Sequence, residues 1–310
     1  MTLQEKTVSY IVQNPHSTVQ EIMGAVSCGK SVAYAALSAV EAVKETATPN
    51  GMLNVVAIGD MHCGHKVGLT PPEWYVNKHK YKLRSQQEEM WEFYASSLKN
   101  TGKIDILFVN GDSIDGSGKR SGGTELLTTD RHEQCDIATR CIQEANADKV
   151  YMTFGTPYHT GVNEDFETII AKNVNAVALD DQLFVNVNGI IFDVKHHTNG
   201  SVTPYGRATA IGRSKVWNTE WSETGNQPKA NCFLRSHVHY DKHTGDSKFI
   251  AMTLPALQGP DTKYGGRRCE GTVSFGLTNF KVAKNQKISN LFWEVHTKDL
   301  ETFKQELLVA

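Results

Sequence analysis

The sequence predicts an α/β fold, a layered sandwich preceded by a small all-helical domain. Two observations support the sandwich: from residue 52 onward apolar strand-like runs alternate with helical patterns, and the later part of the chain is richer in strands. Alternating strands and helices are typical of βαβ units, and a strand-rich second half adds a further sheet. The first 49 residues carry only helical spacing, and 310 residues are enough for one large domain and one small domain.

The first domain, residues 1–49, contains three helical patterns, at 3–14, 18–26 and 30–45. Their layout resembles a helix-turn-helix, in a winged form or without a wing, as found in transcription regulators. A small helical bundle that docks on the main domain or mediates dimerisation is the alternative interpretation. The third helix has few cations beyond Lys30, which weakens the prediction of DNA reading. Residues 46–51, TATPNG, are predicted to form a linker, and 50–310 the main domain.

In the main domain, each apolar run is assigned to a strand and each amphipathic run to a helix. The three early strands are 52–60, 104–112 and 149–156, and the three early helices are 85–100, 130–146 and 164–173. The later part is predicted to contain a hairpin at 182–197, broken at Asn188-Gly189, and strands at 229–240 and 247–257.

Charge and composition narrow the class of protein. The formal net charge of -2 argues against a mainly polybasic nucleic-acid binder, although a local basic groove remains compatible with it. There is no apolar run of membrane-spanning length, and the N-terminus lacks the layout of a signal peptide. We therefore expect a cytoplasmic protein with no membrane partner. None of the six cysteines forms a CxxC pair, so they are expected to be ordinary thiols.

Aspartate and histidine recur where the predicted strands end. The five strand ends read GDMHCGH (59–65), NGDSIDG (110–116), GTPYHTG (155–161), VKHH (194–197) and RSHVHY (235–240). Sites in open α/β sheets form at the carboxyl ends of strands. Carboxylates and imidazoles that meet there favour a metal site with nitrogen and oxygen ligands, which suits Mn, Fe or Zn acting as a Lewis acid.

Each of these elements alone has an ordinary explanation. A Gly-Asp after a strand is often only a turn, and a lone histidine is more often structural than a ligand. Five such elements in order, each after an apolar strand, favour a metal site over chance.

The ordered set GDMH, GDSID, a strand ending in histidine, VKHH and SHVH resembles the calcineurin-like metallophosphoesterase superfamily, over about residues 52–280. The variant details GTPYH and LPALQGPDTKYGGRR resemble phage-encoded or prophage-encoded members. The resemblance implies an αββα sandwich with two divalent metal ions. We expect manganese, with Zn, Fe or Mg as alternatives.

The resemblance also implies a set of ligands. Asp112 would bridge the two metals. The first metal would be held by Asp60, His62 and His239, and the second by His237 and one residue of the pair His196 and His197. Because adjacent strand residues face opposite sides, one of that pair is expected to be the ligand, and His196 is favoured as the first residue past the apolar run.

The third strand end departs from the family pattern. The family usually has GNH there, with Asn as a ligand and His as a catalytic residue, whereas this chain has GTPYH. Thr156 stands in the Asn position and His159 comes two residues later than expected. Either Thr156 or a water replaces the amide oxygen, or the loop lets His159 itself reach the metals. Serine in SHVH replaces the glycine of the family's GHxH, which leaves the ligating atoms unchanged.

The resemblance implies hydrolysis in which a hydroxide held between the two metals attacks phosphorus. His159 is the candidate to protonate the leaving oxygen, and the alternative is a structural partner of Asp112 or Asp115. Asp115 is expected to orient a ligand histidine rather than to bind metal. His65 either touches the substrate or caps a loop. The basic stretches 76–84 and 263–268 are candidate phosphate contacts or solvated faces, and Arg207 and Arg213 could clamp a phosphate.

The predicted function is thus a metal-dependent phosphoesterase, with a phosphodiesterase or nuclease acting on DNA or RNA as the favoured form. The near-neutral charge instead favours a phosphatase acting on a small molecule or a phosphoprotein. A third hypothesis is a nucleic-acid-binding regulatory protein with a weakened catalytic site, which only Thr156 supports. The oligomeric state is not predicted.

Overall fold

The computed structural model describes residues 51–76, 85–161, 165–263, 265 and 273–300, together with 3, 6, 7, 10, 19–29 and 32. The chain divides into two compact units, Met1–Met52 and Leu53–Ala310. In the first unit, α2 (Val19–Val26) matches the second predicted helix, and its Ile22 is buried. The other two predicted helices lie largely outside the described residues. The helix-turn-helix assignment and the domain boundary therefore stay predictions.

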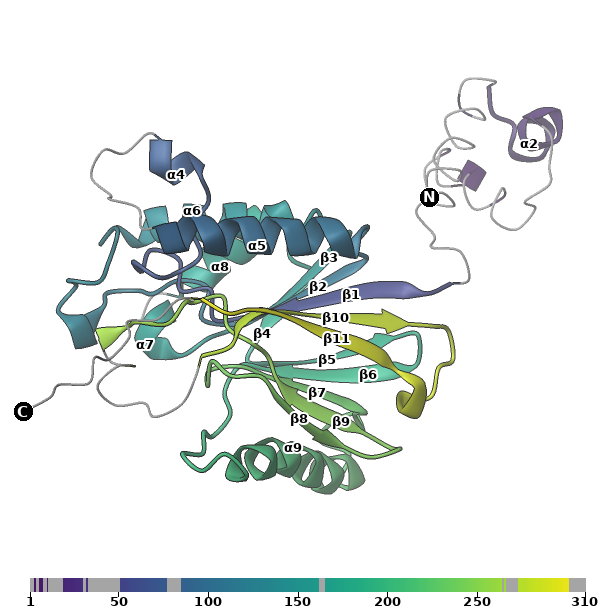
Figure 1. Cartoon of the computed structure of the whole chain (residues 1–310). Coiled ribbons are helices and arrows are strands. Elements are labelled where there is room, and N and C mark those ends of the chain that lie inside the picture. The colour runs from purple at the N-terminus through teal and green to yellow at the C-terminus, as the bar shows by residue number, and fades with distance from the viewer. Residues whose placement is uncertain are drawn as a thin grey trace, which may run out of the picture. The chain divides into compact units, whose positions relative to one another are not determined.

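The first sheet of the second unit has the order β11-β10-β1-β2-β3-β4. Strands β1 to β4 are parallel, and β10 and β11 join β1 in antiparallel pairing. Three helices, α5, α6 and α8, cover one face of this sheet (Figure 1). The bounds are β1 Leu53–Ile58, β2 Ile106–Asn110, β3 Lys149–Thr153, β4 Ala178–Asp180, β10 Phe275–Val282, β11 Phe292–Lys298, α5 Ser85–Thr101, α6 Arg131–Glu144 and α8 Phe166–Asn173.

The second sheet has the order β5-β6-β7-β9-β8. The β5–β6 and β8–β9 pairs are antiparallel, whereas β7 is parallel to both β6 and β9. A single long helix, α9, lies on the outer face of this sheet (Figure 1). The bounds are β5 Gln182–Val187, β6 Ile190–Lys195, β7 Cys232–Arg235, β8 Lys242–Gly245, β9 Ile250–Thr253 and α9 Gly206–Glu223.

Side chains that alternate between the two faces of a strand build the layers of the fold. In β1, Val56 and Ile58 pack under the helices of the first sheet, while Val55 and Ala57 face the second sheet. Successive strand residues point to opposite faces, so the apolar run 55–58 contributes to two cores at once. Phe108 of β2 and Phe192 of β6 meet between the sheets with ring centroids 5.5 Å apart. The predicted layered α/β fold is therefore confirmed, with the layer order helix, sheet, sheet, helix.

The structure differs from the expected elements mainly in the later half. Residues 206–223, for which the sequence predicts no helix, form α9. Its only fully apolar anchor in the core is Ile211, while Val216, Trp217 and Trp221 are exposed. The usual apolar stripe of a surface helix is therefore missing, which explains why periodicity did not reveal the helix. Strands β4, β8, β10 and β11 were also not predicted individually.

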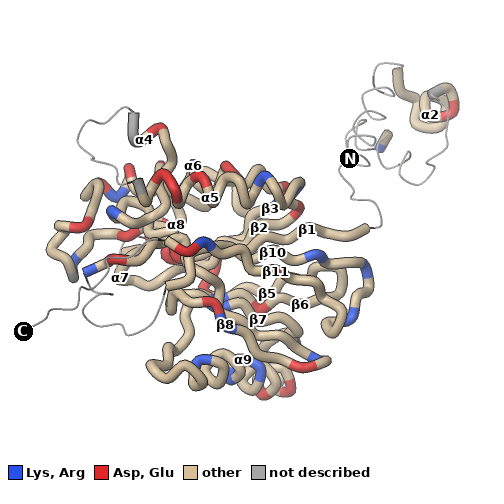
Figure 2. The backbone as a smooth tube through the Cα atoms, viewed as in Figure 1, with Lys and Arg blue, Asp and Glu red and all other residues tan. Residues whose placement is uncertain are grey.

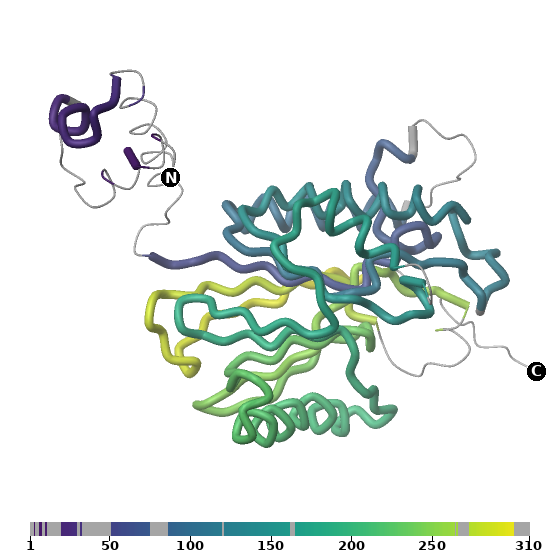
Figure 3. The backbone as a smooth tube through the Cα atoms, turned by 180° about the vertical axis from the view of Figure 1, so that it is seen from behind, coloured from purple at the N-terminus to yellow at the C-terminus, as the bar shows by residue number. Residues whose placement is uncertain are grey.

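Short elements connect the layers. They are α4 (Glu73–Val76), α7 (Pro157–Thr160) and two 3₁₀ turns at Lys119–Ser121 and Ile288–Asn290. Figures 1 and 3 show the β5–β6 and β10–β11 hairpins side by side, where Asn285 N donates to Asn188 O at 3.1 Å.

None of the helices in the described part of the chain is long and apolar enough to cross a membrane. Figure 2 shows that basic and acidic residues are interspersed along the described backbone.

Candidate metal centre

The carboxyl ends of strands from both sheets are tied to one another by backbone hydrogen bonds. Beyond β1 and β2, Asp60 N donates to Gly111 O and His62 N donates to Asp112 O, both at 3.0 Å. Beyond β6 and β7, Ser236 N donates to His196 O at 2.8 Å. The parallel pairing of these strands places their ends at the same edge, so the polar residues that follow them meet.

Five of the predicted ligands have left-handed backbone conformations. Their φ values are 50° for Asp60, 44° for His62, 49° for Asp112, 73° for His237 and 56° for His239. Elsewhere in the described chain, positive φ at non-glycine residues occurs at scattered Asn, Asp and Ser residues. Strained conformations cluster at functional sites, because the surrounding structure holds them in place. The arrangement of these five side chains is thus fixed by the backbone.

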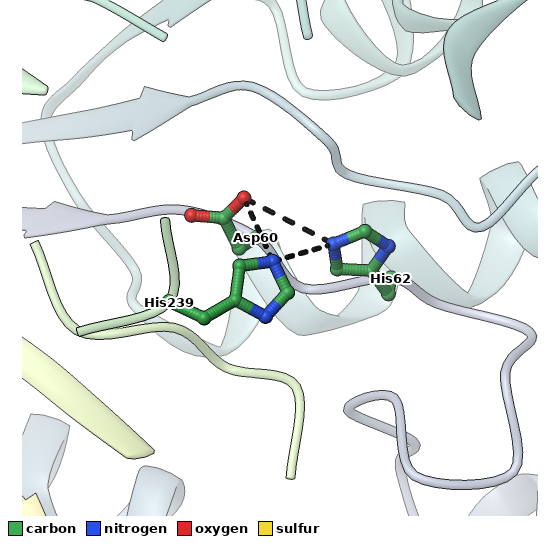
Figure 4. A group of neighbouring side chains, drawn as sticks. All are labelled: Asp60, His62 and His239. Carbon is green, nitrogen blue, oxygen red and sulfur yellow. Dashed lines mark hydrogen bonds and ion pairs between the residues drawn. The ribbon is translucent and has the colours of Figure 1, made fainter. Parts of the chain in front are cut away.

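Asp60, His62 and His239 form a first group (Figure 4). Their ligand atoms lie within 4.8 Å of one another. Asp60 Oδ1 is 3.4 Å from His239 Nε2 and 3.9 Å from His62 Nε2, and the two Nε2 atoms are 3.2 Å apart. The Asp60 side chain is fully buried, and its carboxylate also accepts from His237 N at 3.0 Å.

Asp112, His196 and His237 form a second group. His196 Nδ1 lies 2.7 Å from Asn110 O, and since a carbonyl only accepts, Nδ1 carries the proton in that bond. In the neutral ring, Nε2 then presents a lone pair to Asp112 Oδ2 at 3.1 Å and to Asp60 Oδ1 at 3.9 Å. His196 Nε2 is buried without a hydrogen-bond partner of suitable geometry. A buried lone pair that faces carboxylates requires either a proton or a cation between them.

His159 belongs to a third group, with His62 and Asp112. Its Nδ1 lies 2.9 Å from Asp115 O, which leaves Nε2 free for the centre. The Asp115 carboxylate is 3.2 Å from His62 Nδ1, so Asp115 orients His62 through the nitrogen that faces away from His239. Both histidines are therefore held by the same residue, Asp115, in the loop after β2.

Thr156 lies at the N-terminus of α7 and contacts Asp112 directly. Its backbone N donates to Asp112 Oδ1 at 2.6 Å, and its hydroxyl lies 3.0 Å from the same oxygen. Thr156 adopts an extended conformation immediately before Pro157, which begins the helix. In this arrangement the hydroxyl of Thr156 acts as a donor that positions Asp112.

Glu167 supports the centre from the first turn of α8, and sequence analysis did not identify it. Its carboxylate accepts from Ser113 N at 3.1 Å and from Gly155 N at 2.6 Å, which joins the ends of β2 and β3. Complete burial raises the pKa of Glu167 to about 7. The available signal was an acidic residue next to the apolar residues of the helical run FETII.

Burial lowers the pKa of two histidines of the centre, whereas the nearby carboxylates, against burial, raise the pKa of His196 and His239. Burial lowers the pKa of His237 to about 4, and burial also lowers the pKa of His62, so both rings are neutral at pH 7. Burial alone would lower the pKa of His196, but Asp112 and then Asp60 outweigh it and raise the pKa to about 10. The same histidine holds the pKa of Asp112 well below its usual value, against the effect of burial. Neutral imidazoles and ionised carboxylates are ligands of Mn, Fe and Zn, and a cation can take the place of the His196 proton.

The structure separates the two histidines of VKHH. His196 is buried inside the centre, whereas His197 is exposed and belongs to none of the three groups. The next residue along an extended chain points the other way, which brings His196 to the carboxylates and His197 to the surface. His197 still contacts the centre from outside, with its ring centroid 4.9 Å from that of His237.

The predicted substrate-binding residues lie in different surroundings. His65 is buried, and its Nδ1 accepts from Val67 N at 3.1 Å, which corresponds to the loop-capping interpretation. The Arg207 guanidinium lies 4.0 Å from the Tyr240 ring centroid and thereby attaches the start of α9 to the loop that carries His239. Arg213 lines a hollow beside α9. The basic stretches 76–84 and 263–268 lie outside the described residues except for Val76, Lys263 and Gly265.

Comparison with protein-family models finds no match, and neither does comparison with curated protein sequences. Among solved structures, a Vps29 double mutant from Entamoeba histolytica is similar with a TM-score of 0.42 and 10% identity, over 80% of this chain and 100% of that chain. An archaeal phosphodiesterase is similar with a TM-score of 0.38 and 10% identity, over 79% and 100%. A predicted phosphoesterase from Streptococcus pneumoniae has a TM-score of 0.34 and 9% identity, over 80% and 98%. At such values the similarity assigns no activity to this chain.

Proposed function

We propose that this chain is a metal-dependent phosphoesterase that hydrolyses phosphodiester bonds. One observation carries the proposal: Asp60, Asp112 and the Nε2 atoms of His62, His196 and His239 converge at one edge of two sheets. Their order along the chain is the one that resembles the calcineurin-like metallophosphoesterase superfamily. Two divalent metals bound there would activate a water and neutralise charge that develops on the phosphate.

The assignment of ligands follows the groups described above. Asp60, His62 and His239 would hold one metal, His196 and His237 would hold the other, and Asp112 would contact both. His159, whose Nδ1 is held by Asp115 O, would then act on the substrate rather than on a metal. Its Nε2 is the candidate atom to carry a proton to the leaving oxygen, since the side chain is 19% exposed and the substrate can reach it.

Several finer features belong to the proposal as well. Manganese as the native metal, DNA or RNA as the substrate, a phage-type origin and a cytoplasmic location stay predictions from the sequence. The resemblance of residues 1–49 to a helix-turn-helix is the reason to favour nucleic acid. Basic and acidic residues are interspersed along the described backbone and do not favour nucleic acid over other substrates (Figure 2). A comparison of hydrolysis rates on DNA, RNA and small phosphate esters would decide between them.

The test is hydrolysis of bis(p-nitrophenyl) phosphate with Mn, Zn or Mg by wild type and by Asp112→Asn. We expect metal-dependent turnover by wild type and a loss of at least about 100-fold in the variant, because Asp112 belongs to two of the three groups. Asp241→Asn is the matched control, since it makes the same change at an exposed aspartate two residues after His239. No turnover by wild type with any metal, or equal turnover in Asp112→Asn, would contradict the proposal.

A further inference from the structure

A hollow of about 360 Å³ lies between α9 and the strands β5, β6 and β7. Lys195 and His197 line it from the end of β6, and Arg213, Trp217 and Trp221 line it from α9. His197 directly follows His196 of the candidate metal centre and contacts His237. The hollow is therefore adjacent to the centre, on the side of the second sheet.

Two tryptophans in this hollow have no role in the core. Trp217 is 62% exposed and Trp221 is 47% exposed. The helix is attached elsewhere, through buried Ile211 and through Asn218, which donates to Pro228 O at 2.9 Å and accepts from Ala230 N at 2.8 Å. Large apolar side chains left exposed beside a candidate active site are typical of binding surfaces.

The spacing of the three α9 residues makes them one surface. Arg213, Trp217 and Trp221 are four residues apart in succession, so they lie on one face of the helix, about 6 Å apart along its axis. Two indole rings and a guanidinium in a row form a platform on which flat aromatic rings can stack.

The charge of the hollow is positive. Its acid, Asp193, is neutralised by Arg235, whose Nη2 lies 2.8 Å from Asp193 Oδ2, with both side chains buried. Among the residues that the structure describes, neither Lys195 nor Arg213 forms an ion pair. Two cations beside stacking surfaces match a ligand that carries both a negative charge and a flat ring. An uncharged apolar ligand would leave both cations without a partner.

We propose that this hollow binds the nucleoside next to the scissile phosphate. The base stacks on Trp217 and Trp221, and the flanking phosphate pairs with Arg213 and Lys195. The proposal rests on the phosphodiesterase function above and narrows its substrates to nucleoside phosphates, either as mononucleotide esters or within a single strand of DNA or RNA.

The kinetic test compares two diesters with the same leaving group, thymidine 5′-(p-nitrophenyl phosphate) and methyl p-nitrophenyl phosphate. For Trp217→Ala and Trp221→Ala in the full chain with Mn, we expect kcat/KM on the thymidine ester to fall about 5- to 100-fold, as loss of a stacking ring does elsewhere. The methyl ester should change less than about twofold, because it has no base to stack. Trp217→Phe should recover most of the activity, and Val216→Ala is the matched control at an equally exposed neighbour outside the hollow. Equal losses on both esters, or no loss on either, would overturn the base-binding site.

A binding measurement separates this proposal from the phosphodiesterase proposal. Tryptophan fluorescence is followed while thymidine monophosphate, a short oligo(dT) or a short oligo(U) is added to the full chain without metal. Quenching in wild type that is lost in Trp217→Ala supports the site even if no hydrolysis occurs, and the three probes identify the form of nucleotide that is bound. Hydrolysis of both esters without any quenching or any tryptophan effect would leave the phosphodiesterase standing and overturn the base-binding site.

Discussion

At the scale of single residues, Asp112 depends on Thr156 for its position. The carboxylate accepts from both the backbone N and the hydroxyl of Thr156, and it faces Nε2 of His196. The hydroxyl bond is the part that belongs to this side chain, because any residue supplies the backbone donor. Thr156 thus gives a structural role to the position where the resembling family has an asparagine.

Replacing Thr156 by valine should therefore weaken the centre without unfolding the chain. Valine keeps the shape and the N–H donor but removes the hydroxyl, and we expect Mn affinity and kcat/KM to fall about 10- to 100-fold, as for other residues that orient ligands. Thr156→Ser retains the hydroxyl and should stay within about threefold of wild type. Calorimetric titration with Mn measures the affinity. Identical behaviour of the two variants would mean that the hydroxyl does not position Asp112.

Glu167 should make folding stability depend on pH. Its pKa of about 7 lies above the ordinary value of 4.5, because burial disfavours the ionised form. A group with a raised pKa in the folded state contributes stability that is full below pH 4.5 and is lost as the pH rises through 7. Between pH values below 4.5 and above 7, the free energy of unfolding of wild type should fall by about 3 kcal/mol more than that of Glu167→Gln.

Urea unfolding of the metal-free protein at about pH 5 and pH 8 measures this difference. Glu167→Gln should be less stable at both pH values, since its amide NH₂ faces a backbone donor, but its stability should change less with pH. Glu88→Gln makes the same chemical change at an exposed position of α5 and should retain the wild-type slope. Parallel slopes for wild type and Glu167→Gln would refute the assignment.

At the scale of elements, the ends of β2 and β3 approach too closely for a side chain at Gly155. A Cβ at this position would lie 2.2 Å from Asp112 N and 2.2 Å from Asp112 Oδ1. Gly111, at the other side of the contact, has a φ of 73° and would meet His196 in the same way. The two glycines allow the loops of neighbouring strands to bring Asp112 and His196 together.

Gly155→Ala should displace Asp112 and abolish metal-dependent hydrolysis. Because the atoms in the way are backbone and a ligand carboxylate, relief requires movement of the centre itself, and we expect a loss of at least about 100-fold in activity. Gly200→Ala is the control, as its Cβ would meet only Val238 at an ordinary 3.6 Å. Circular dichroism checks that both variants are folded. A Gly155→Ala protein with normal activity would show that the close approach is not required.

At the scale of the whole molecule, the second unit contains its own complete core. The cluster under α5, α6 and α8 and the cluster between the sheets consist of described residues from 53 onward. The contacts that build the candidate centre likewise join Asp60, Asp112 and the histidines of this unit alone. Folding and chemistry are therefore expected to reside in the same unit.

Deletion of residues 1–49 tests this expectation. The truncated chain should unfold cooperatively at nearly the same temperature and hydrolyse bis(p-nitrophenyl) phosphate within about twofold of the full chain. Binding of oligonucleotides in a gel shift, compared between the two chains, measures what the first unit adds. An aggregated or inactive truncated protein would show that residues 1–49 are needed by the second unit.

Much of the fold could be predicted because its signals are local. The buried runs of β1, β2 and β3 and the helices between them follow from residues that are neighbours in sequence. Helix α9 could not be predicted in the same way. Its large apolar residues Trp217 and Trp221 are exposed, so the apolar residues of this helix do not mark a buried face. Where a helix exposes large apolar side chains for another purpose, the periodicity that reveals helices is weakened.

The sequence by itself determined the type of chemistry: nitrogen and oxygen donors at the ends of apolar strands, in the order Asp60, Asp112, His196 and His237. Only the tertiary structure decided which atoms meet. It brought His237 N to the carboxylate of Asp60, 177 residues away, and turned His196 inward and His197 outward. The physical reason is that strand character depends on near neighbours, whereas the meeting of strand ends depends on how two sheets pair and stack.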